Sequence, residues 1–176
     1  DGLQWSNGDA LTAEDFEASW KRAASEDLAA DYGYMFEVVK GYGTDDLAVE
    51  AVDAKTLKVT LANSVSYWNE LLAFPTYYPV HEATVANEAW ATDPSTYVSN
   101  GAYTLTAWEH DSVMTLTKND NYHDAASVTM PELKFYLSDD ANNMLTNFKD
   151  GAWLLIDDVP TAEIQTLKAN YPDELV

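Results

Sequence analysis

The chain has 176 residues, a length that allows one compact domain or two small ones. Thirty acidic residues against nine Lys and Arg give a formal charge of -21, which repels the phosphates of nucleic acids and anionic membrane surfaces. The chain has no cysteine, so disulfides, thiolate metal sites and cysteine nucleophiles are excluded. With 47% hydrophobic residues, the sequence can form a buried core, which argues against intrinsic disorder.

The clearest helix pattern covers residues 12–26. Thr12 suits the N-cap position, because a threonine side chain can satisfy one of the free N–H groups of the first turn. Two acidic residues follow in that turn, where negative charge is favourable. Phe16, Trp20 and Ala23 then recur at spacings of four and three, which places them on one face of a helix. We interpret this apolar stripe as the face that packs against the core.

Between this helix and residue 99, the pattern predicts short helices and one β-hairpin. Glycines at 41 and 43 end the first of these helices, and Pro75 ends the second. Alternating residues on either side of a short polar turn indicate the hairpin. The predicted elements are a helix over residues 32–40, strands over 49–53 and 56–61, and helices over 66–73 and 81–91.

Beyond a polar breaker at residues 92–95, we place the main boundary in the chain near residue 99. Alternation then predicts a second hairpin with one buried face. Strands and helices follow one another after it, which indicates an α/β layer with a crossover connection. The predicted elements are strands over residues 103–107, 113–117, 133–137 and 153–156, and helices over 140–149 and 161–170. The expected fold class is therefore α/β, of mixed α+β type.

No residue pattern supplies a hydrolytic or metal-dependent centre. His81, His110 and His123 stand in turn-like or loop-like contexts, without a G-x-S-x-G element and without H-E-x-x-H spacing. The oxygen-rich residues 119–124 could in principle hold Ca²⁺, but they lack the glycine and the final glutamate of an EF-hand loop. We interpret them as a solvated turn. We expect no metal, no cofactor and no catalytic residue in this chain.

The competing enzyme hypothesis is a carboxylate-based glycosidase. Its acids would come from Asp139, Asp140, Asp157 or Asp158. Glycoside cleavage needs two carboxyl groups about 5 to 9.5 Å apart across a cleft. Adjacent residues of a helix or strand point in different directions, so these pairs are better explained by capping and solubility.

Aromatic residues support a third hypothesis, a carbohydrate-binding module or another small-ligand-binding protein. The chain has six Trp, eleven Tyr and five Phe, several of them in turn-like segments. Such side chains offer rigid, amphipathic contact area for a sugar or a peptide. A carbohydrate module would need the rings of Trp5, Trp20 and Trp68 on one exposed platform.

A series of motifs runs in order along most of the chain. It begins with W-S-N-G-D-A-L-T-A-E-D-F at residues 5–16 and includes L-L-A-F-P-T-Y-Y-P-V at residues 71–80 and V-S-N-G-A-Y at residues 98–103. Further motifs lie at residues 19–22, 57–61, 64–68, 119–123 and 168–176. Together they resemble the oligopeptide-binding proteins of ABC importers, which are extracytoplasmic solute-binding proteins of the dipeptide and oligopeptide type.

The sequence departs from the family pattern at two places. Ala10 stands where the family mostly has proline, which costs a little turn rigidity. The triplet at residues 152–154 is Ala-Trp-Leu, where Glu-Leu-Asp or a similar triplet is usual. This change makes the strand predicted there more apolar, as if it were more deeply covered or differently paired.

The resemblance implies a periplasmic-binding-protein-like fold. Residues 1–99 would form the extra α+β domain characteristic of the peptide binders, and residues 100–176 part of the first α/β ligand-binding lobe. Family members are considerably longer, so the resemblance implies that the chain is an internal fragment and that most anchors for peptide termini lie outside it. Tyr32 corresponds to the tyrosine that lines the peptide cleft, although Asp31 and Gly33 depart from the usual Pro-Tyr-Ala-Ser-Tyr-like segment.

The function implied by the resemblance is capture of oligopeptides outside the cytoplasmic membrane and delivery to a membrane ABC permease, without catalysis. The expected protein is a monomer that binds no nucleic acid. It would be periplasmic, or lipid-anchored to the outer face of the cell membrane. No apolar run approaches the roughly 18 to 20 residues of a membrane span, and residues 1–5 lack signal-peptide features. From the residues alone, either the protein is cytosolic or any export signal lies outside this chain. The resemblance implies the second, with the signal or anchor outside these residues.

Overall fold

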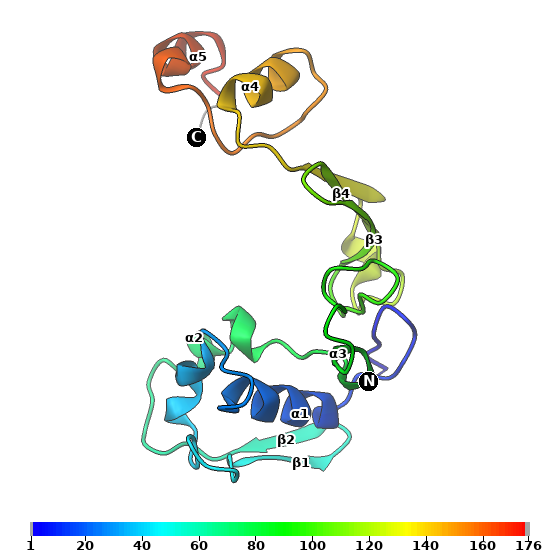
Figure 1. Cartoon of the computed structure of the whole chain (residues 1–176), viewed down its shortest axis with the longest axis vertical. Coiled ribbons are helices and arrows are strands. Elements are labelled where there is room, and N and C mark those ends of the chain that lie inside the picture. Colours follow the sequence, from blue (N-terminus) through cyan, green and yellow to red (C-terminus); the bar gives the residue numbers. More distant parts are fainter. Residues whose placement is uncertain (1, 175–176) are drawn as a thin grey trace. The chain divides into compact units, whose positions relative to one another are not determined.

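The computed structural model of the chain describes residues 2–174. By their internal contacts, these residues divide into two compact units. Unit 1 is the described part of Asp1–Ala107 together with Thr115–Leu133. Unit 2 is Trp108–Met114 together with the described part of Lys134–Val176. Figure 1 shows helices and strands of the chain, and the fold is of the expected mixed α/β class.

The first predicted helix is confirmed as α1 (Ala13–Ala24). Thr12 precedes it, and the Thr12 backbone N–H donates a hydrogen bond to the Asp15 carboxylate over 2.8 Å. This bond satisfies a backbone donor at the helix start and places a negative charge at the positive helix end. The apolar stripe faces inward as expected, since Trp20 is only 4% exposed.

The first predicted hairpin is also confirmed, and it packs against α1 (Figure 1). It consists of β1 (Val49–Asp53) and β2 (Thr56–Val59), which pair antiparallel. Two hydrogen bonds join it to the helix. The Glu17 carboxylate accepts one of 2.6 Å from the Ala51 backbone N–H, and the Ala54 carbonyl, in the hairpin turn, accepts one of 3.0 Å from the Ala13 N–H. Helix and hairpin are therefore held together by packing and by these two hydrogen bonds.

The core of unit 1 is a cluster of aromatic and aliphatic side chains against α1. Trp20 Nε1 donates to the Tyr77 carbonyl over 2.8 Å, and the Tyr77 hydroxyl donates to the Met35 carbonyl over 2.7 Å. Both rings thus have partners for their polar atoms while their apolar faces pack. Burial raises the pKa of Tyr77 to about 12. The buried cluster comprises Trp20, Phe36, Val39, Leu47, Val49 and Tyr77.

Two predicted helices of unit 1 are shorter than expected. Residues 32–40 contain a 3₁₀ helix, η1 (Gly33–Val38), rather than an α-helix. Residues 66–73 supply only one α-helical turn, α2 (Trp68–Leu71). Pro75 then starts a 3₁₀ turn, η2 (Pro75–Tyr77), because proline cannot continue the preceding helix.

The helix predicted over residues 81–91 is wrong beyond its first turn, α3 (Glu82–Val85). The side chain of Asn87 competes with helix formation, since its Oδ1 atom accepts a hydrogen bond of 3.1 Å from the Ala89 N–H. A series of turns follows in place of the helix. The rings of Trp90 and Tyr97 stack on each other there, with 5.8 Å between their centroids.

Three strands form the second sheet, in the order β3-β4-β5. They are β3 (Tyr103–Glu109), β4 (Val113–Lys118) and β5 (Glu132–Tyr136), and each contributes residues to both units. The predicted hairpin and the strand after it are therefore confirmed. The single buried face expected for the hairpin is only partly formed, because β4 is half-buried along its whole length.

Unit 2 contains the two helices predicted near the end of the chain. α4 (Ala141–Lys149) is capped by Asp140, whose Oδ1 atom accepts hydrogen bonds from the backbone N–H groups of Asn142 and Asn143. A 3₁₀ turn, η4 (Thr161–Glu163), leads into α5 (Ile164–Asn170). The capping role expected for the acids at the start of α4 is confirmed for Asp140.

The strand predicted over residues 153–156 is wrong. This segment has no regular structure, and its leucines are strongly exposed, Leu154 by 89% and Leu155 by 83%. A strand requires a neighbouring strand to satisfy its backbone N–H and C=O groups. Among residues 2–174, no strand pairs with this segment. The expectation that it is deeply covered is therefore also wrong for the described part of the chain.

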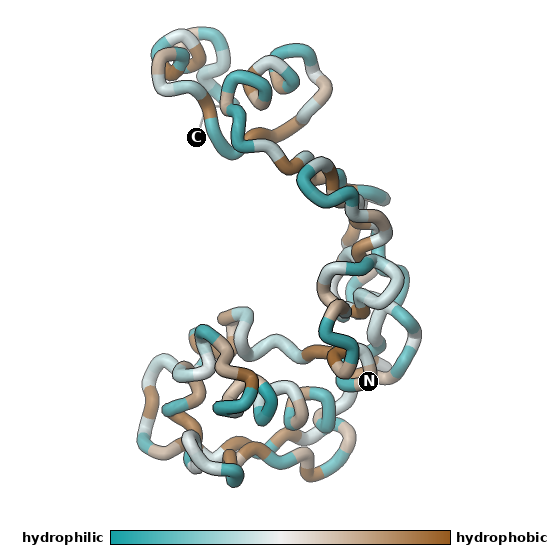
Figure 2. Tube along the Cα trace, viewed as in Figure 1, coloured by the Kyte–Doolittle hydropathy of each residue, from teal (hydrophilic) through white to brown (hydrophobic). Residues whose placement is uncertain are grey.

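Hydrophobic positions occur in short runs separated by hydrophilic ones throughout the chain (Figure 2). Within the described residues, no helix is both long enough and apolar enough to cross a membrane. The excess of 30 Asp and Glu over nine Lys and Arg gives the low isoelectric point of about 4.1.

Candidate functional site

Tyr32, the site residue predicted from the sequence, lies in unit 1 immediately before η1. Half of Tyr32 is exposed. Its ring contacts that of Phe74 edge to face, with centroids 5.0 Å apart, and lies 6.2 Å from that of Tyr34. We call these three residues, Tyr32, Tyr34 and Phe74, the aromatic surface.

Gly33 positions the two tyrosines of the aromatic surface. A Cβ atom at Gly33 would lie only 2.9 Å from the carbonyl oxygen of Ala23, in the last turn of α1. The absence of a side chain therefore allows the start of η1 to approach α1 closely. This approach gives a physical reason for glycine at a position where the family resemblance leads us to expect another small residue.

The aromatic surface has both apolar and polar groups to offer a ligand. Tyr34 is exposed to a similar extent as Tyr32, and Phe74 is half-buried beside them. Within residues 2–174, neither the Tyr32 nor the Tyr34 hydroxyl makes a hydrogen bond. Their rings can cover apolar parts of a ligand while their hydroxyls bind its polar groups.

A separate cavity of about 730 Å³ lies in unit 1 between the start of α1, the hairpin and residues 77–79. Its lining is mainly apolar and includes Leu11, Phe16 and Leu57. Tyr32 does not line it. This cavity and the aromatic surface are therefore two distinct features of unit 1.

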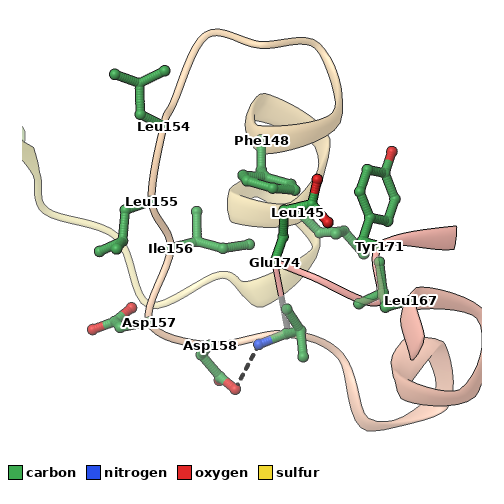
Figure 3. Close-up of a pocket in the computed structure, with 11 residues that line it drawn as sticks. Leu145, Phe148, Leu154, Leu155, Ile156, Asp157, Asp158, Leu167, Tyr171 and Glu174 are labelled. Carbon is green, nitrogen blue, oxygen red and sulfur yellow. Dashed lines mark hydrogen bonds between the residues drawn. The ribbon is translucent and has the colours of Figure 1, made fainter. Parts of the chain in front are cut away.

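Unit 2 has a cavity of about 480 Å³ between α4, α5 and the irregular segment that precedes α5 (Figure 3). Ile156 points toward Leu145 and Phe148 of α4, whereas Leu154 and Leu155 point away from them. The irregular segment thus covers part of α4 with one apolar residue and leaves two exposed.

The acids of the glycosidase hypothesis are placed as caps and solvent-exposed residues. Asp139 and Asp140 are exposed at the start of α4, where Asp140 serves as the N-cap. Asp157 and Asp158 are exposed at the rim of the unit 2 cavity, and Asp158 accepts a hydrogen bond from the Val159 N–H over 2.8 Å. These positions support the capping and solubility interpretation of the acids.

The structure does not support the hypothesis of a carbohydrate-binding module, because the three rings that it requires are not exposed together. Trp5 and Trp20 are buried, with 1% and 4% exposed. Trp68 is half-buried and packs edge to face on Trp20, with centroids 6.2 Å apart. No shared exposed platform of these three rings exists.

The histidines lie in different local environments. His81 Nε2 lies 2.9 Å from an Asp9 carboxylate oxygen, and His81 Nδ1 lies 2.6 Å from the Thr84 hydroxyl. His110 and His123 are exposed. In the part of the chain that the structure describes, no group of three or more His, Asp or Glu side chains is arranged to hold a metal ion. The contact between His81 and Asp9 was not predicted, because the two residues are distant in sequence.

The segment interpreted from the sequence as a solvated turn has a buried residue at its start. Asn119 is only 3% exposed. Its side chain donates to the Gly101 carbonyl over 2.8 Å and accepts from the Asn121 N–H over 3.0 Å. Asn119 therefore fastens this turn to the start of β3, and its amide oxygen is already used within the turn.

Comparison of the sequence with known protein families assigns the family of this chain. Residues 1–174 match the family model described as "Bacterial extracellular solute-binding proteins, family 5 Middle". The chain belongs to this family of solute-binding proteins, as the sequence motifs suggested. The match covers the residues of both units.

Individual relatives give the same assignment. The chain is 39% identical to the oligopeptide-binding protein OppA of Bacillus subtilis, over 96% of this chain and 33% of that protein. It is 32% identical to the probable deoxycholate-binding periplasmic protein YgiS of Escherichia coli, over 99% of this chain and 34% of that protein. The structure of Listeria monocytogenes OppA bound to peptide is similar with a TM-score of 0.81 and 33% identity, over 86% of this chain and 32% of that one. The chain thus spans about a third of the length of the curated relatives it matches.

Proposed function

We propose that this chain is part of an extracytoplasmic solute-binding protein that captures oligopeptides for import by a membrane ABC permease. The observation that carries the proposal is the exposed aromatic surface, on a chain whose family consists of solute-binding proteins. Tyr32 would contact the bound peptide. No chemical step is required, because the protein binds its solute and passes it on unchanged.

An extended peptide offers alternating side chains and a regular series of backbone polar groups. The exposed part of a tyrosine ring can cover such a side chain, and its hydroxyl can bond a peptide N–H or C=O. Complete burial of a large apolar side chain contributes about 1.5 to 3 kcal/mol. Because Tyr32 is already half-buried, its further burial should contribute about 1 kcal/mol.

The organisation of the whole protein is part of the same proposal. Residues 1–99 would belong to the extra α+β domain of the peptide-binding type, and residues 100–176 to part of the first ligand-binding lobe. The protein would act as a monomer in the periplasm, or lipid-anchored to the outer face of the membrane. A charge of -21 supports the expectation that nucleic acid is not a partner.

Titration of the chain with a library of tri- to pentapeptides, followed by nuclear magnetic resonance, tests the proposal. We expect binding weaker than micromolar, with the ring signals of Tyr32 and Tyr34 among those that shift. Y32A should weaken the interaction about fivefold, which corresponds to the estimated 1 kcal/mol. Y42A is the matched control, since Tyr42 is also exposed but lies outside the aromatic surface.

Three results would contradict specific parts of the proposal. Shifts confined to residues outside the aromatic surface would exclude Tyr32 as a contact. Binding of deoxycholate at the same rings, without binding of any peptide, would replace the proposed solute class with a steroid. Micromolar or tighter peptide binding would show that the anchors for peptide termini lie within residues 1–176.

A further inference from the structure

The chain contains two Asn-Gly dipeptides, Asn7-Gly8 and Asn100-Gly101, in very different surroundings. An asparagine followed by glycine is chemically labile, because the backbone nitrogen of the next residue can attack the side-chain amide carbon. Glycine favours this attack, since the lack of a Cβ atom lets the backbone reach the required conformation. Whether the attack occurs in a folded protein depends on how firmly both groups are held.

Both reacting groups are held at Asn7. The Gly8 N–H donates to the Trp5 carbonyl over 2.9 Å. The Asn7 side chain accepts from the Asp9 N–H over 3.1 Å and donates to the Asp9 carboxylate over 2.7 Å. Attack by the Gly8 nitrogen on Asn7 would therefore require three hydrogen bonds to break.

Both reacting groups are free at Asn100. Within residues 2–174, neither the Asn100 side chain nor the Gly101 N–H makes a hydrogen bond. Asn100 lies outside regular secondary structure, and Gly101 is exposed. A Cβ atom added to Gly101 would come no closer than 3.8 Å to any residue other than its two chain neighbours, the nearest atom being the Tyr103 carbonyl oxygen. The space beside the Gly101 Cα atom is therefore uncrowded, and the hydrogen bonds nearby hold Ser99 and the Gly101 carbonyl, not the two reacting groups.

We propose that Asn100 is a site of spontaneous deamidation and that Asn7 is protected by its hydrogen bonds. The Gly101 nitrogen, having lost its proton to solvent, forms a bond to Cγ of Asn100. The side-chain nitrogen takes up a proton from solvent, its bond to Cγ breaks, and it leaves as ammonia. Water hydrolyses the resulting succinimide at either carbonyl, which leaves aspartate or isoaspartate at position 100.

The modification would alter contacts on both sides of Asn100. The Ser99 carbonyl accepts a hydrogen bond from the Ser6 N–H over 2.7 Å, and the Gly101 carbonyl accepts one from the Asn119 side chain over 2.8 Å. Isoaspartate inserts an additional methylene into the main chain between these two carbonyls. Both products also add a negative charge to a chain that already carries -21. Deamidation should therefore loosen the attachment of residues 99–101 to Ser6 and Asn119.

Incubation of the folded chain in mildly alkaline buffer, with peptide mapping by mass spectrometry over time, tests the proposal. We expect the mass change of deamidation at Asn100, with isoaspartate among the products, and at least about tenfold slower reaction at Asn7, since one net hydrogen bond already accounts for such a factor. In concentrated urea the two rates should become similar. D9A should accelerate the reaction at Asn7 and leave the rate at Asn100 unchanged.

Equal rates at Asn7 and Asn100 in the folded chain would overturn the proposal. So would a rate at Asn100 that rises in urea as much as the rate at Asn7, because Asn100 would then react only after unfolding. N100A supplies the assignment control, since alanine has no side-chain amide to lose and the mass change at position 100 must disappear.

Discussion

Replacement of Glu17 by glutamine tests how α1 is joined to the hairpin. The Glu17 carboxylate accepts a hydrogen bond from the Ala51 N–H and pairs with Lys21 one turn further along α1. The hydrogen bond from Lys21 is the largest cause that lowers the pKa of Glu17, and the Ala51 N–H is the next. Folding therefore stabilises the ionised form of this side chain.

The expected magnitude follows from these contacts. A hydrogen bond to a charged group contributes about 1.5 to 3 kcal/mol, and an exposed helical ion pair about 0.3 to 0.5 kcal/mol. The Glu17 side chain is 27% exposed, so solvent weakens both contributions. Glutamine can still accept a hydrogen bond from Ala51, but as a neutral group. We expect E17Q to lower the free energy of unfolding by about 1 to 2 kcal/mol near neutral pH.

The pH dependence of this effect has a definite sign. Because the pKa of Glu17 is lower in the folded than in the unfolded chain, its contribution is fully present above the usual value of 4.5. It is lost as the pH falls through the pKa of the folded state. The difference in unfolding free energy between E17Q and the unmodified chain should therefore shrink toward zero in acid.

Urea unfolding followed by tryptophan fluorescence at several pH values measures the difference. E50Q is the matched control, because the Glu50–Lys58 pair of the same hairpin is 64% exposed at both side chains. We expect a loss below about 0.5 kcal/mol for E50Q. An effect of E17Q that does not change with pH, or an equally large effect of E50Q, would refute the reasoning.

Three further predictions concern packing and charge. G33A should lower the free energy of unfolding by about 1 to 3 kcal/mol, because its Cβ atom would lie 2.9 Å from the Ala23 carbonyl oxygen. G101A, whose Cβ atom would make only an ordinary contact of 3.8 Å with the Tyr103 carbonyl oxygen, should have little effect in the same urea titration. L145A should cost about 2 to 5 kcal/mol because Leu145 is buried, whereas L154A at an 89% exposed position should leave stability almost unchanged. The melting temperature should rise with added salt, since the screening length falls from about 30 Å to about 8 Å between 0.01 M and physiological salt. A melting temperature that stays flat would show that the acidic residues are well separated or compensated.

Elements marked by local signals could be predicted from the sequence. The starts of α1 and α4 could be predicted at Thr12 and Asp140, because the hydrogen bonds of a helix start join residues no more than three positions apart. Alternation of apolar residues likewise predicted both hairpins, whose strands are joined by short turns. At residues 86–91 the sequence predicted a continued helix, but the Asn87 side chain offered the backbone another partner and a turn formed.

The environment of the candidate site could not be predicted in the same way. Tyr32 was identified through the family resemblance, and no local pattern indicates that its ring meets Phe74, which is remote in sequence. The same holds for His81 and Asp9, which are 72 residues apart. Such pairs arise from how α1, η1 and the following turns pack, so they depend on the assembled core rather than on spacing.

The segment at residues 153–156 shows what an apolar run specifies and what it leaves open. Trp-Leu-Leu-Ile has the composition of a buried strand, but only a second strand can supply the hydrogen bonds of a ladder. In the described part of the chain the backbone N–H groups of Ala152 and Trp153 both reach the Asn147 carbonyl instead, which bends the segment around the end of α4. Ile156 then packs toward α4 while Leu154 and Leu155 remain in solvent (Figure 3). Hydrophobic composition thus indicates that burial would stabilise a segment, whereas hydrogen bonding to a neighbouring strand decides whether the segment becomes a strand.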